Sequence, residues 1–261
     1  MRLNLTIARQ MIGGELLRLR KKRGFIALVL LAVIAPIVIA FGYDVIAHAS
    51  DPAKHGPAGG LHNYTNVLVM LGLFMGPVAA ILIGAEAGAG DLAAGVFRDN
   101  VLTGRSRTAL FLARIPAALA VCLSVTAVGF SIGVAGTFAF AGGLSTPSAS
   151  LILESAGWLA LANGVVCVVA IGLGSLTGSR PGTITALLGW QLVLSPLLLG
   201  STSLGSIRRP LLDAPMQFLR PGPANGAPSV AMSAGVAIVV LALWTFVIPS
   251  LGAWRTRTRD A

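Results

Sequence analysis

Charged residues are scarce in this chain of 261 residues. Asp, Glu, Lys and Arg make up 11% of it, whereas a soluble domain carries about 25%. The charges are also clustered, with long uncharged stretches between the clusters. Because an ionised side chain at the centre of a bilayer costs roughly 3 kcal/mol, this pattern excludes an ordinary soluble domain. It predicts an all-α integral membrane protein.

Lysine and cysteine are rare as well. None of the three lysines, Lys21, Lys22 and Lys54, follows the glycine spacing of a phosphate-binding P-loop, so the chain is not expected to hydrolyse ATP. Cys122 and Cys167 both lie within apolar runs, which excludes a disulfide framework and a cysteine metal site. No cluster of His, Asp and Glu and no nucleophile elbow is present. We therefore expect no enzyme, no metal and no cofactor on this chain.

Acidic residues are outnumbered, nine against nineteen Lys and Arg, and the formal net charge is +10. On proteins that bind nucleic acid, basic residues lie among other polar residues on a folded surface. Here they lie at the ends of apolar runs. The partner predicted for them is the membrane lipid surface, and no nucleic acid is expected.

Hydrophobic residues make up 55% of the chain, and a spanning helix needs about 20 consecutive residues that are mostly apolar. Six stretches of roughly this kind are predicted to span the membrane, at 25–43, 65–85, 115–140, 154–175, 183–199 and 230–251. They divide the chain into an N-terminal segment 1–24, a six-span domain 25–251 and a tail 252–261. The prolines in these spans are tolerated where neighbouring helices satisfy the carbonyls that they free. The four tryptophans are expected at the membrane interface or facing lipid.

The distribution of Lys and Arg predicts the orientation. Fifteen lie before the first span, after the last, or in the two–three and four–five connections, and four lie on the other side. We expect both termini in the cytoplasm and the protein in the cell (inner) membrane. A signal peptide cleaved after Ala47-His48-Ala49 is the alternative. The basic region of 23 residues and the apolar run of 19 residues are both long for one, so a retained first span is preferred.

Residues 1–24 carry a helical pattern of their own. Their apolar residues recur at three- and four-residue spacing, at Leu3, Ile7, Met11, Ile12, Leu16 and Leu19. This predicts an amphipathic helix in the cytoplasmic interface, with basic residues near anionic headgroups. A solvated basic tail is the alternative.

Residues 84–114, between the second and third spans, form a polar segment with four arginines and three acids. Its length allows a short helix on the membrane surface, a turn, and the helix that crosses back. Ser106 is a candidate N-cap for that last helix. The segment would face the cytoplasm, where a soluble protein could dock on it.

This segment resembles the membrane subunits of type-2 ABC transporters, the short permeases of bacterial exporters. Asp91 stands where the family commonly has Glu, four residues before Gly95. Residues 95–98, Gly-Val-Phe-Arg, match a Gly-Thr-Leu-Arg group, with Val in place of Thr. Residues 104–107, Gly-Arg-Ser-Arg, match a turn, and Arg114 matches a basic residue seven positions later. Weaker likenesses at 175–198 and 218–226 extend the resemblance over nearly the whole chain.

The resemblance implies a translocation subunit that hydrolyses nothing, with ATP and Mg²⁺ bound by a separate ABC ATP-binding subunit. By that likeness, a short cytoplasmic coupling helix between spans two and three docks on the ATP-binding subunit, and it involves Asp91, Gly95, Arg98, Gly104, Arg105, Arg107 and Arg114. Arginines suit such docking because they make bidentate contacts to carboxylates, although they could also only set the topology. The family also implies pairing with a second copy or a sister permease.

The expected cargo is amphipathic or lipid-like, a drug, peptide or lipid, because the spans offer few charges for an ionic one. Gly84 and Gly88 suit a close helix contact, without indicating which helix they meet. The competing function is a secondary transporter driven by an ion gradient, which needs acids within the membrane. Its candidates, Asp44, Glu86 and Glu154, all lie near span ends. Arg208 and Arg209 with Asp213 could gate an outer exit, or could be solvated loop charges.

Overall fold

Long helices build the whole of the described structure. The computed structural model describes residues 5–93, 106–222 and 230–258, and no strand occurs among them. Six helices there are long and apolar enough to cross a membrane, which confirms the predicted all-helical fold with six such helices. In chain order they are α2 (Arg23–Ser50), the run Gly60–Asp91, α6 (Arg107–Ala139), α7 (Ala149–Thr177), the run Arg180–Gly200 and α11 (Ala234–Thr258).

The helices differ in extent from the apolar stretches that predict them. The first continues to Ser50 rather than 43, and the third begins at Arg107 rather than 115. The last is displaced along the chain, to Ala234–Thr258 from 230–251. Hydropathy counts only residues suited to hydrocarbon, whereas backbone hydrogen bonding continues through the polar layer on either side.

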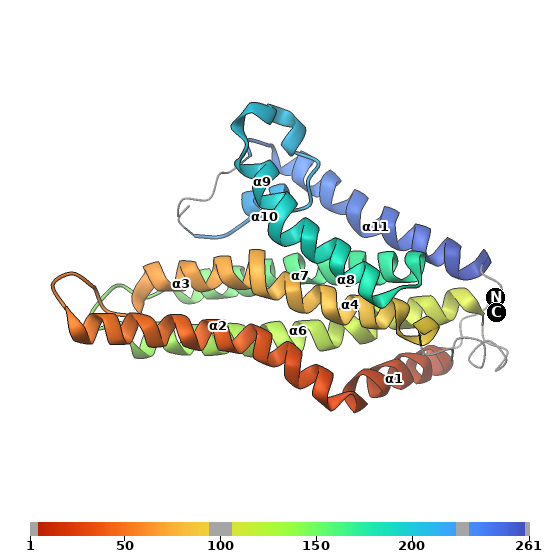
Figure 1. Cartoon of the computed structure of the whole chain (residues 1–261), viewed down its shortest axis with the longest axis horizontal. Coiled ribbons are helices and arrows are strands. Elements are labelled where there is room, and N and C mark those ends of the chain that lie inside the picture. Colours follow the sequence, from red (N-terminus) through yellow and green to blue (C-terminus); the bar gives the residue numbers. More distant parts are fainter. Residues whose placement is uncertain (1–4, 94–105, 223–229, 259–261) are drawn as a thin grey trace.

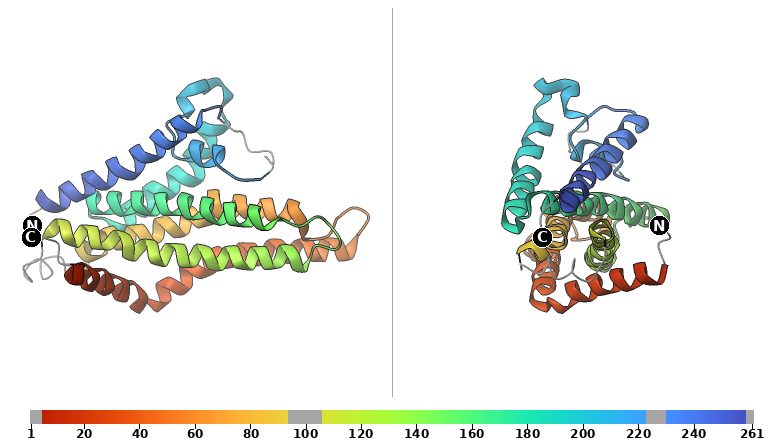
Figure 2. Two further views of the ribbon diagram at one scale, coloured as in Figure 1. Left: turned by 180° about the vertical axis from the view of Figure 1, so that it is seen from behind. Right: turned by 90° about the vertical axis from the view of Figure 1, so that its right-hand side faces the viewer.

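A helix before the first span, α1 (Leu5–Lys21), meets α2 at an elbow. Lys22 at the elbow has φ −79° and ψ 61°, outside the helical region. Figures 1 and 2 show α1 and the last turns of α11 at the same end of the molecule. We call this the α1 end and the opposite end the far end. Leu19 is buried against the bundle, whereas Leu17 is exposed.

Two helices, α4 (Met75–Ala93) and α7, form the centre of the bundle. In α7 72% of the most apolar window is buried, whereas in α2, α11 and the run Arg180–Gly200 only 22% is. Glycines allow α4 and α7 to approach closely. A Cβ on Gly84 would lie 2.5 Å from the carbonyl oxygen of Cys167, and one on Gly88 would meet the backbone of Ile171. Gly84 and Gly88 therefore make a close helix contact within this chain, between α4 and α7.

Two of the spans contain a π-helical turn shortly before a proline. In the second span, α3 (Gly60–Val69) passes through η1 (Met70–Phe74) into α4, and Pro77 follows three residues after the end of η1. In the fifth, α8 (Arg180–Gly189) passes through η2 (Trp190–Leu194) into α9 (Ser195–Gly200), which contains Pro196. A proline frees the carbonyl four residues earlier. The carbonyl of Leu73 accepts a hydrogen bond from Gln191 Nε2 at 3.3 Å, so a neighbouring helix satisfies it as expected.

The fifth and sixth spans diverge from the other helices as they leave the α1 end (Figures 1 and 2). The connection between them, which contains η3 (Thr202–Arg208) and α10 (Asp213–Phe218), lies to one side of the bundle near the middle of its long axis. Trp158 Nε1 of α7 donates to the carbonyl of Met216 at 2.9 Å and so holds α10 on the bundle. At the α1 end, α11 returns to α7, where Gly252 lies against Gly172.

Candidate functional site

Charged side chains gather at the α1 end, where α1, α4, α6 and α8 come together. An acid within an apolar helix needs a partner, because a buried unpaired charge is very costly. Glu86 and Asp91 of α4 are such acids, with 1% and 5% of their surfaces exposed. Both take part in ion pairs, and these pairs form the candidate functional site.

Asp91 is shared between two arginines. Nη2 of Arg114 lies 2.8 Å from its Oδ2, and Arg18 of α1 pairs with its Oδ1. Arg114 also donates to the carbonyl of Gly88 at 3.2 Å and is 1% exposed. Arg18 pairs in addition with Glu15, at 2.9 Å on the same face of α1. One carboxylate thus joins α1, α4 and α6.

Glu86 lies one turn and a half earlier on α4 and has two cations of its own. Lys22, the elbow residue, pairs with its Oε1, and Nη1 of Arg180 lies 2.8 Å from its Oε2. Arg180 begins α8, and its guanidinium stacks over the ring of Phe25 at 5.3 Å from the centroid. Glu86 therefore connects the start of the first span with the start of the fifth.

The ion pairs form two groups, one around Asp91 and one around Glu86, which are connected through α4; we call both together the network. Its seven side chains carry four positive and three negative charges. Burial lowers the pKa of Arg18, and the negative charge of Glu15 opposes that effect. Removing one partner of a buried pair costs about 3–5 kcal/mol, because it leaves the other charge uncompensated. The network therefore joins α1, α4, α6 and α8 at this end, and we call it the joint.

Three of the seven predicted coupling residues lie in the described part of the chain. Asp91 and Arg114 are brought together, but as a buried pair with each other rather than as an exposed surface. The other four lie outside the described residues, at Gly95, Arg98, Gly104 and Arg105. Asp91 and Arg114 thus bracket the predicted coupling segment and anchor both of its flanks in the joint.

The third, Arg107, is at the first turn of α6. Ser106 accepts a hydrogen bond from the backbone N–H of Ala109 at 3.2 Å, so the predicted N-cap is confirmed. Nη1 of Arg107 donates to the carbonyl of Arg257 at 3.3 Å. This contact ties the start of the third span to the end of the sixth, at the same end as the network.

The partners of Glu86 and Asp91 come from α1, the elbow, α6 and α8. The signal that could have indicated this is the position of Glu86 itself, an acid closing an apolar run of 21 residues, 65–85. Such an acid requires a cation. Basic residues that end or begin neighbouring spans, as at the elbow and in the four–five turn, are the candidates to supply it.

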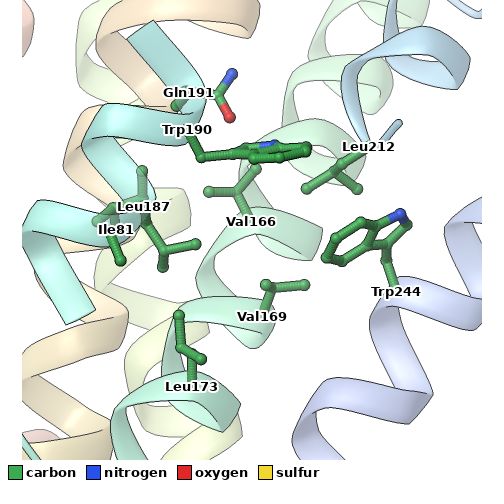
Figure 3. A pocket seen from close by; sticks show the side chains of 10 residues that line it. Ile81, Val166, Val169, Leu173, Leu187, Trp190, Gln191, Leu212 and Trp244 are labelled. Carbon is green, nitrogen blue, oxygen red and sulfur yellow. The ribbon is translucent and has the colours of Figure 1, made fainter. Parts of the chain in front are cut away.

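An apolar cavity lies between the central helices and the tilted spans. Its volume is about 220 Å³, and its lining comes from α4, α7, α8, η2, α11 and Leu212. Figure 3 shows Trp190 and Trp244 on its walls, with Val166 and Val169 on the α7 side. Trp244 Nε1 already donates to the carbonyl of Pro210 at 2.9 Å. The cavity therefore presents apolar surfaces and indole faces.

The tryptophans depart from the expectation that they face the interface or lipid. Trp254 is 59% exposed, but Trp158 is 5% exposed and hydrogen-bonded to α10, so for Trp158 the expectation is wrong. Trp190 and Trp244 line the cavity instead. Hydropathy cannot distinguish an indole facing lipid from one facing a cavity, because both surroundings are apolar.

One further buried acid lies at the start of α10. Asp213, 5% exposed, accepts hydrogen bonds from Gln191 Nε2 at 2.9 Å and from the hydroxyl of Ser195. Burial raises its pKa above the ordinary value, and the two neutral donors only partly oppose this. Arg208 and Arg209 do not pair with it: they donate to the carbonyls of Leu199 and Ala231. The proposed grouping of these three residues is therefore wrong.

Within residues 5–93, 106–222 and 230–258, no three His, Cys, Asp or Glu side chains are grouped to hold a metal ion. The three candidate acids of an ion-driven transporter are dispersed. Asp44 accepts from Asn63 at 3.2 Å, Glu154 is exposed, and Glu86 belongs to the network. No model of a protein family matches this chain, and no curated protein matches it significantly.

Proposed function

We propose that this chain is the membrane permease subunit of an ATP-driven ABC transporter and exports an amphipathic or lipid-like substrate. The observation that carries the proposal is the buried joint around the segment between the second and third spans. Asp91 and Arg114 anchor the two flanks of that segment. Through Arg18, and through Lys22 and Arg180 on Glu86, the same joint reaches α1, the elbow and α8.

Such a joint suits a membrane subunit whose helices are moved by conformational changes of a docked protein. A separate ATP-binding subunit would dock on the segment around Arg98 and Arg105 and displace it during the ATP cycle. Because the flanks are held by buried ion pairs, the displacement would pass to the helices rather than be absorbed locally. Hydrolysis and Mg²⁺ binding would belong to the partner, and this chain would be no enzyme.

The apolar cavity supports the class of cargo. Its indoles and aliphatic walls suit an apolar or amphipathic molecule that enters from the bilayer, and they offer no charge to an ionic one. The weakly buried faces of α2, α11 and the run Arg180–Gly200 are available to lipid or to a second membrane subunit. We propose that this chain pairs there with a copy of itself or with a sister permease.

The orientation belongs to the same proposal. The basic residues counted on the cytoplasmic side include Arg18 of α1, Arg180, which pairs with Glu86, Arg107, which contacts the last turn of α11, and Arg255 in that turn. These elements come together at the α1 end (Figure 1). We propose that the α1 end faces the cytoplasm of a cell whose inner membrane holds the protein. α1 would then lie along the cytoplasmic interface.

The test is co-purification with the ATP-binding protein encoded by an adjacent reading frame. The chain alone should show no ATPase activity, and the co-expressed partner should be retained on it. Replacing Arg98, Arg105 and Arg107 by Glu should abolish retention. The matched control reverses Arg255 and Arg257, which are exposed at the same end, and should retain the partner. Retention by the triple variant would remove the coupling role of the segment.

A second candidate function is supported by Asp213. A transporter driven by an ion gradient needs a titratable acid in an apolar setting, and Asp213 is the buried carboxyl with only neutral donors among the described residues. Transport in reconstituted vesicles without ATP, abolished by a protonophore and by Asp213→Asn, would favour it. Transport that requires ATP and survives Asp213→Asn would exclude it.

A further inference from the structure

The elbow between α1 and α2 carries an excess of positive charge. Five of the six residues from 18 to 23 are Arg or Lys. Two of them, Arg18 and Lys22, are used in the buried network. The other three are exposed and form no ion pair with any residue that the structure describes: Arg20, Lys21 and Arg23. The elbow therefore presents three cations that the described part of the protein does not neutralise.

An apolar groove of about 470 Å³ lies beside these cations, where the elbow passes over α6. α1 contributes Leu16 and Arg20, α2 contributes Ile26 and Leu30, and α6 contributes the face between Ala120 and Val128. Among the described residues, Arg20 is the only charged one in this lining. The groove is thus apolar along its length and cationic at one margin.

The other polar side chain in the described part of the lining is Ser124. Its hydroxyl donates to the carbonyl of Ala120 at 2.7 Å, within its own helix. The described side chains of the groove walls therefore offer no free polar donor apart from the guanidinium of Arg20. A polar or peptide-like occupant would lose hydrogen bonds to water here without replacing them. A hydrocarbon chain would lose none.

We propose that this groove binds one anionic phospholipid, with its phosphate on Arg20 and one acyl chain along α6. A guanidinium presents paired N–H donors that match phosphate oxygens. Lys21 and Arg23 favour a headgroup with net negative charge over a zwitterionic one. The ammonium group of a zwitterionic headgroup would add to the positive charge that is already uncompensated here. The bound lipid fills the space between α1, α2 and α6 and holds the elbow against the bundle.

A second copy of the chain does not fit this place as well. A symmetric dimer across the groove would bring each set of three cations toward the same set on the partner. Like charges brought together destabilise an interface. An anionic lipid removes that excess, so charge complementarity selects the lipid as the occupant.

The experiment compares lipids on the purified full-length chain in detergent. Dioleoyl-phosphatidylglycerol should raise the melting temperature, and dioleoyl-phosphatidylcholine at the same mole fraction should raise it much less. Arg20→Gln should weaken phosphatidylglycerol binding, measured by native mass spectrometry, by about tenfold or more, which corresponds to one lost charge-assisted contact. The control Arg9→Gln removes an exposed arginine of α1 outside the groove and should bind as the wild type does.

A second variant fills the groove without touching a charge. Ala120→Phe places a ring in the space for the acyl chain and should reduce phosphatidylglycerol binding, whereas Ala135→Phe, an exposed position on α6 outside the lining, should not. A phosphatidylglycerol with a diazirine on its acyl chain should cross-link to peptides of α6 that contain residues 120–128.

Four outcomes would overturn the proposal. One is an equal response to the two phospholipids. Another is phosphatidylglycerol binding that persists in both Arg20→Gln and Ala120→Phe, as expected of a diffuse attraction to the basic surface. A third is full stabilisation by glycerol 3-phosphate, which has no chain to occupy the groove. The fourth is a lipid-independent dimer that Ala120→Phe dissociates, since a second copy would then fill the groove.

Discussion

Arg114 and Asp91 form a buried ion pair, 2.8 Å between Nη2 and Oδ2, although they belong to different helices separated by 22 residues of chain. Arg114 is 1% exposed and Asp91 5%. The pair closes the two flanks of the segment between the second and third spans against each other. It sets the geometry from which any docked protein would act.

The first prediction concerns this pair. Asp91→Asn removes the carboxylate that pairs with the buried guanidinium of Arg114 and should lower the free energy of unfolding by about 3–5 kcal/mol. The measurement is thermal or denaturant unfolding of the purified chain in detergent, followed by tryptophan fluorescence. Because Lys22 and Arg180 are 43% and 39% exposed in their side chains, Glu86→Gln should cost less than Asp91→Asn.

The double variant Asp91→Leu with Arg114→Met separates stability from transmission. It replaces the two charges by apolar groups and should recover most of the lost stability, because both members of the buried pair are removed together and Arg18 keeps Glu15 as a partner. Stimulation by substrate of the ATP-binding partner that we propose should stay low, because the ion pair no longer connects the two flanks of the segment. Normal stimulation in the double variant would show that the pair serves stability alone.

The second prediction is a pH dependence from Asp213, whose pKa is raised by burial. Between the unfolded pKa of about 3.9 and the raised native pKa, the native state holds a proton that the unfolded state has released. Stability therefore falls as pH rises through that window. Hydrogen exchange of α10 should quicken as pH rises, beyond the intrinsic change of the exchange rate.

Asp213→Asn should remove this dependence, because the amide cannot ionise. The control Asp51→Asn changes an exposed acid in the connection after α2 and should leave the dependence as it is in the wild type. An α10 whose protection is independent of pH in the wild type would contradict the assignment.

The third prediction tests the contact between α4 and α7. A Cβ at Gly84 would lie 2.5 Å from the Cys167 carbonyl oxygen and 2.6 Å from the Cβ of Ala170. Gly84→Ala should therefore destabilise by about 1–3 kcal/mol through overpacking. Gly157→Ala on α7, where the new methyl meets nothing within 4 Å, should be neutral or stabilise by up to about 1 kcal/mol. Equal melting temperatures for the two variants would exclude the close approach.

The fourth prediction concerns orientation. Both native cysteines are buried, so an impermeant maleimide reports single introduced cysteines. Lys54→Cys should be labelled on intact cells, whereas Arg98→Cys and Arg255→Cys should be labelled only after the membrane is permeabilised. Labelling of Arg98→Cys from outside would reverse the proposed orientation and remove the docking role of its segment.

Several features follow from the sequence alone because their causes are local. Six long apolar runs determine six helices, since a backbone in hydrocarbon must satisfy its hydrogen bonds within the helix. Ser106 was recognisable as a cap from its place before a helical run, and it does accept the Ala109 N–H. The prolines within spans predicted carbonyls that neighbours must satisfy, and Gln191 satisfies that of Leu73.

Tertiary structure alone decided the partners. Glu86 had to find a cation, but whether Lys22, Arg180 or another would meet it depends on helix rotation and depth, which no local pattern encodes. The sequence allows Gly84 to pack against any helix with small residues, and in the structure it packs against α7. The walls of the cavity and of the elbow groove come from segments far apart in the chain. Hydropathy depends on each residue and its neighbours in sequence, whereas pairing depends on how whole helices pack against one another.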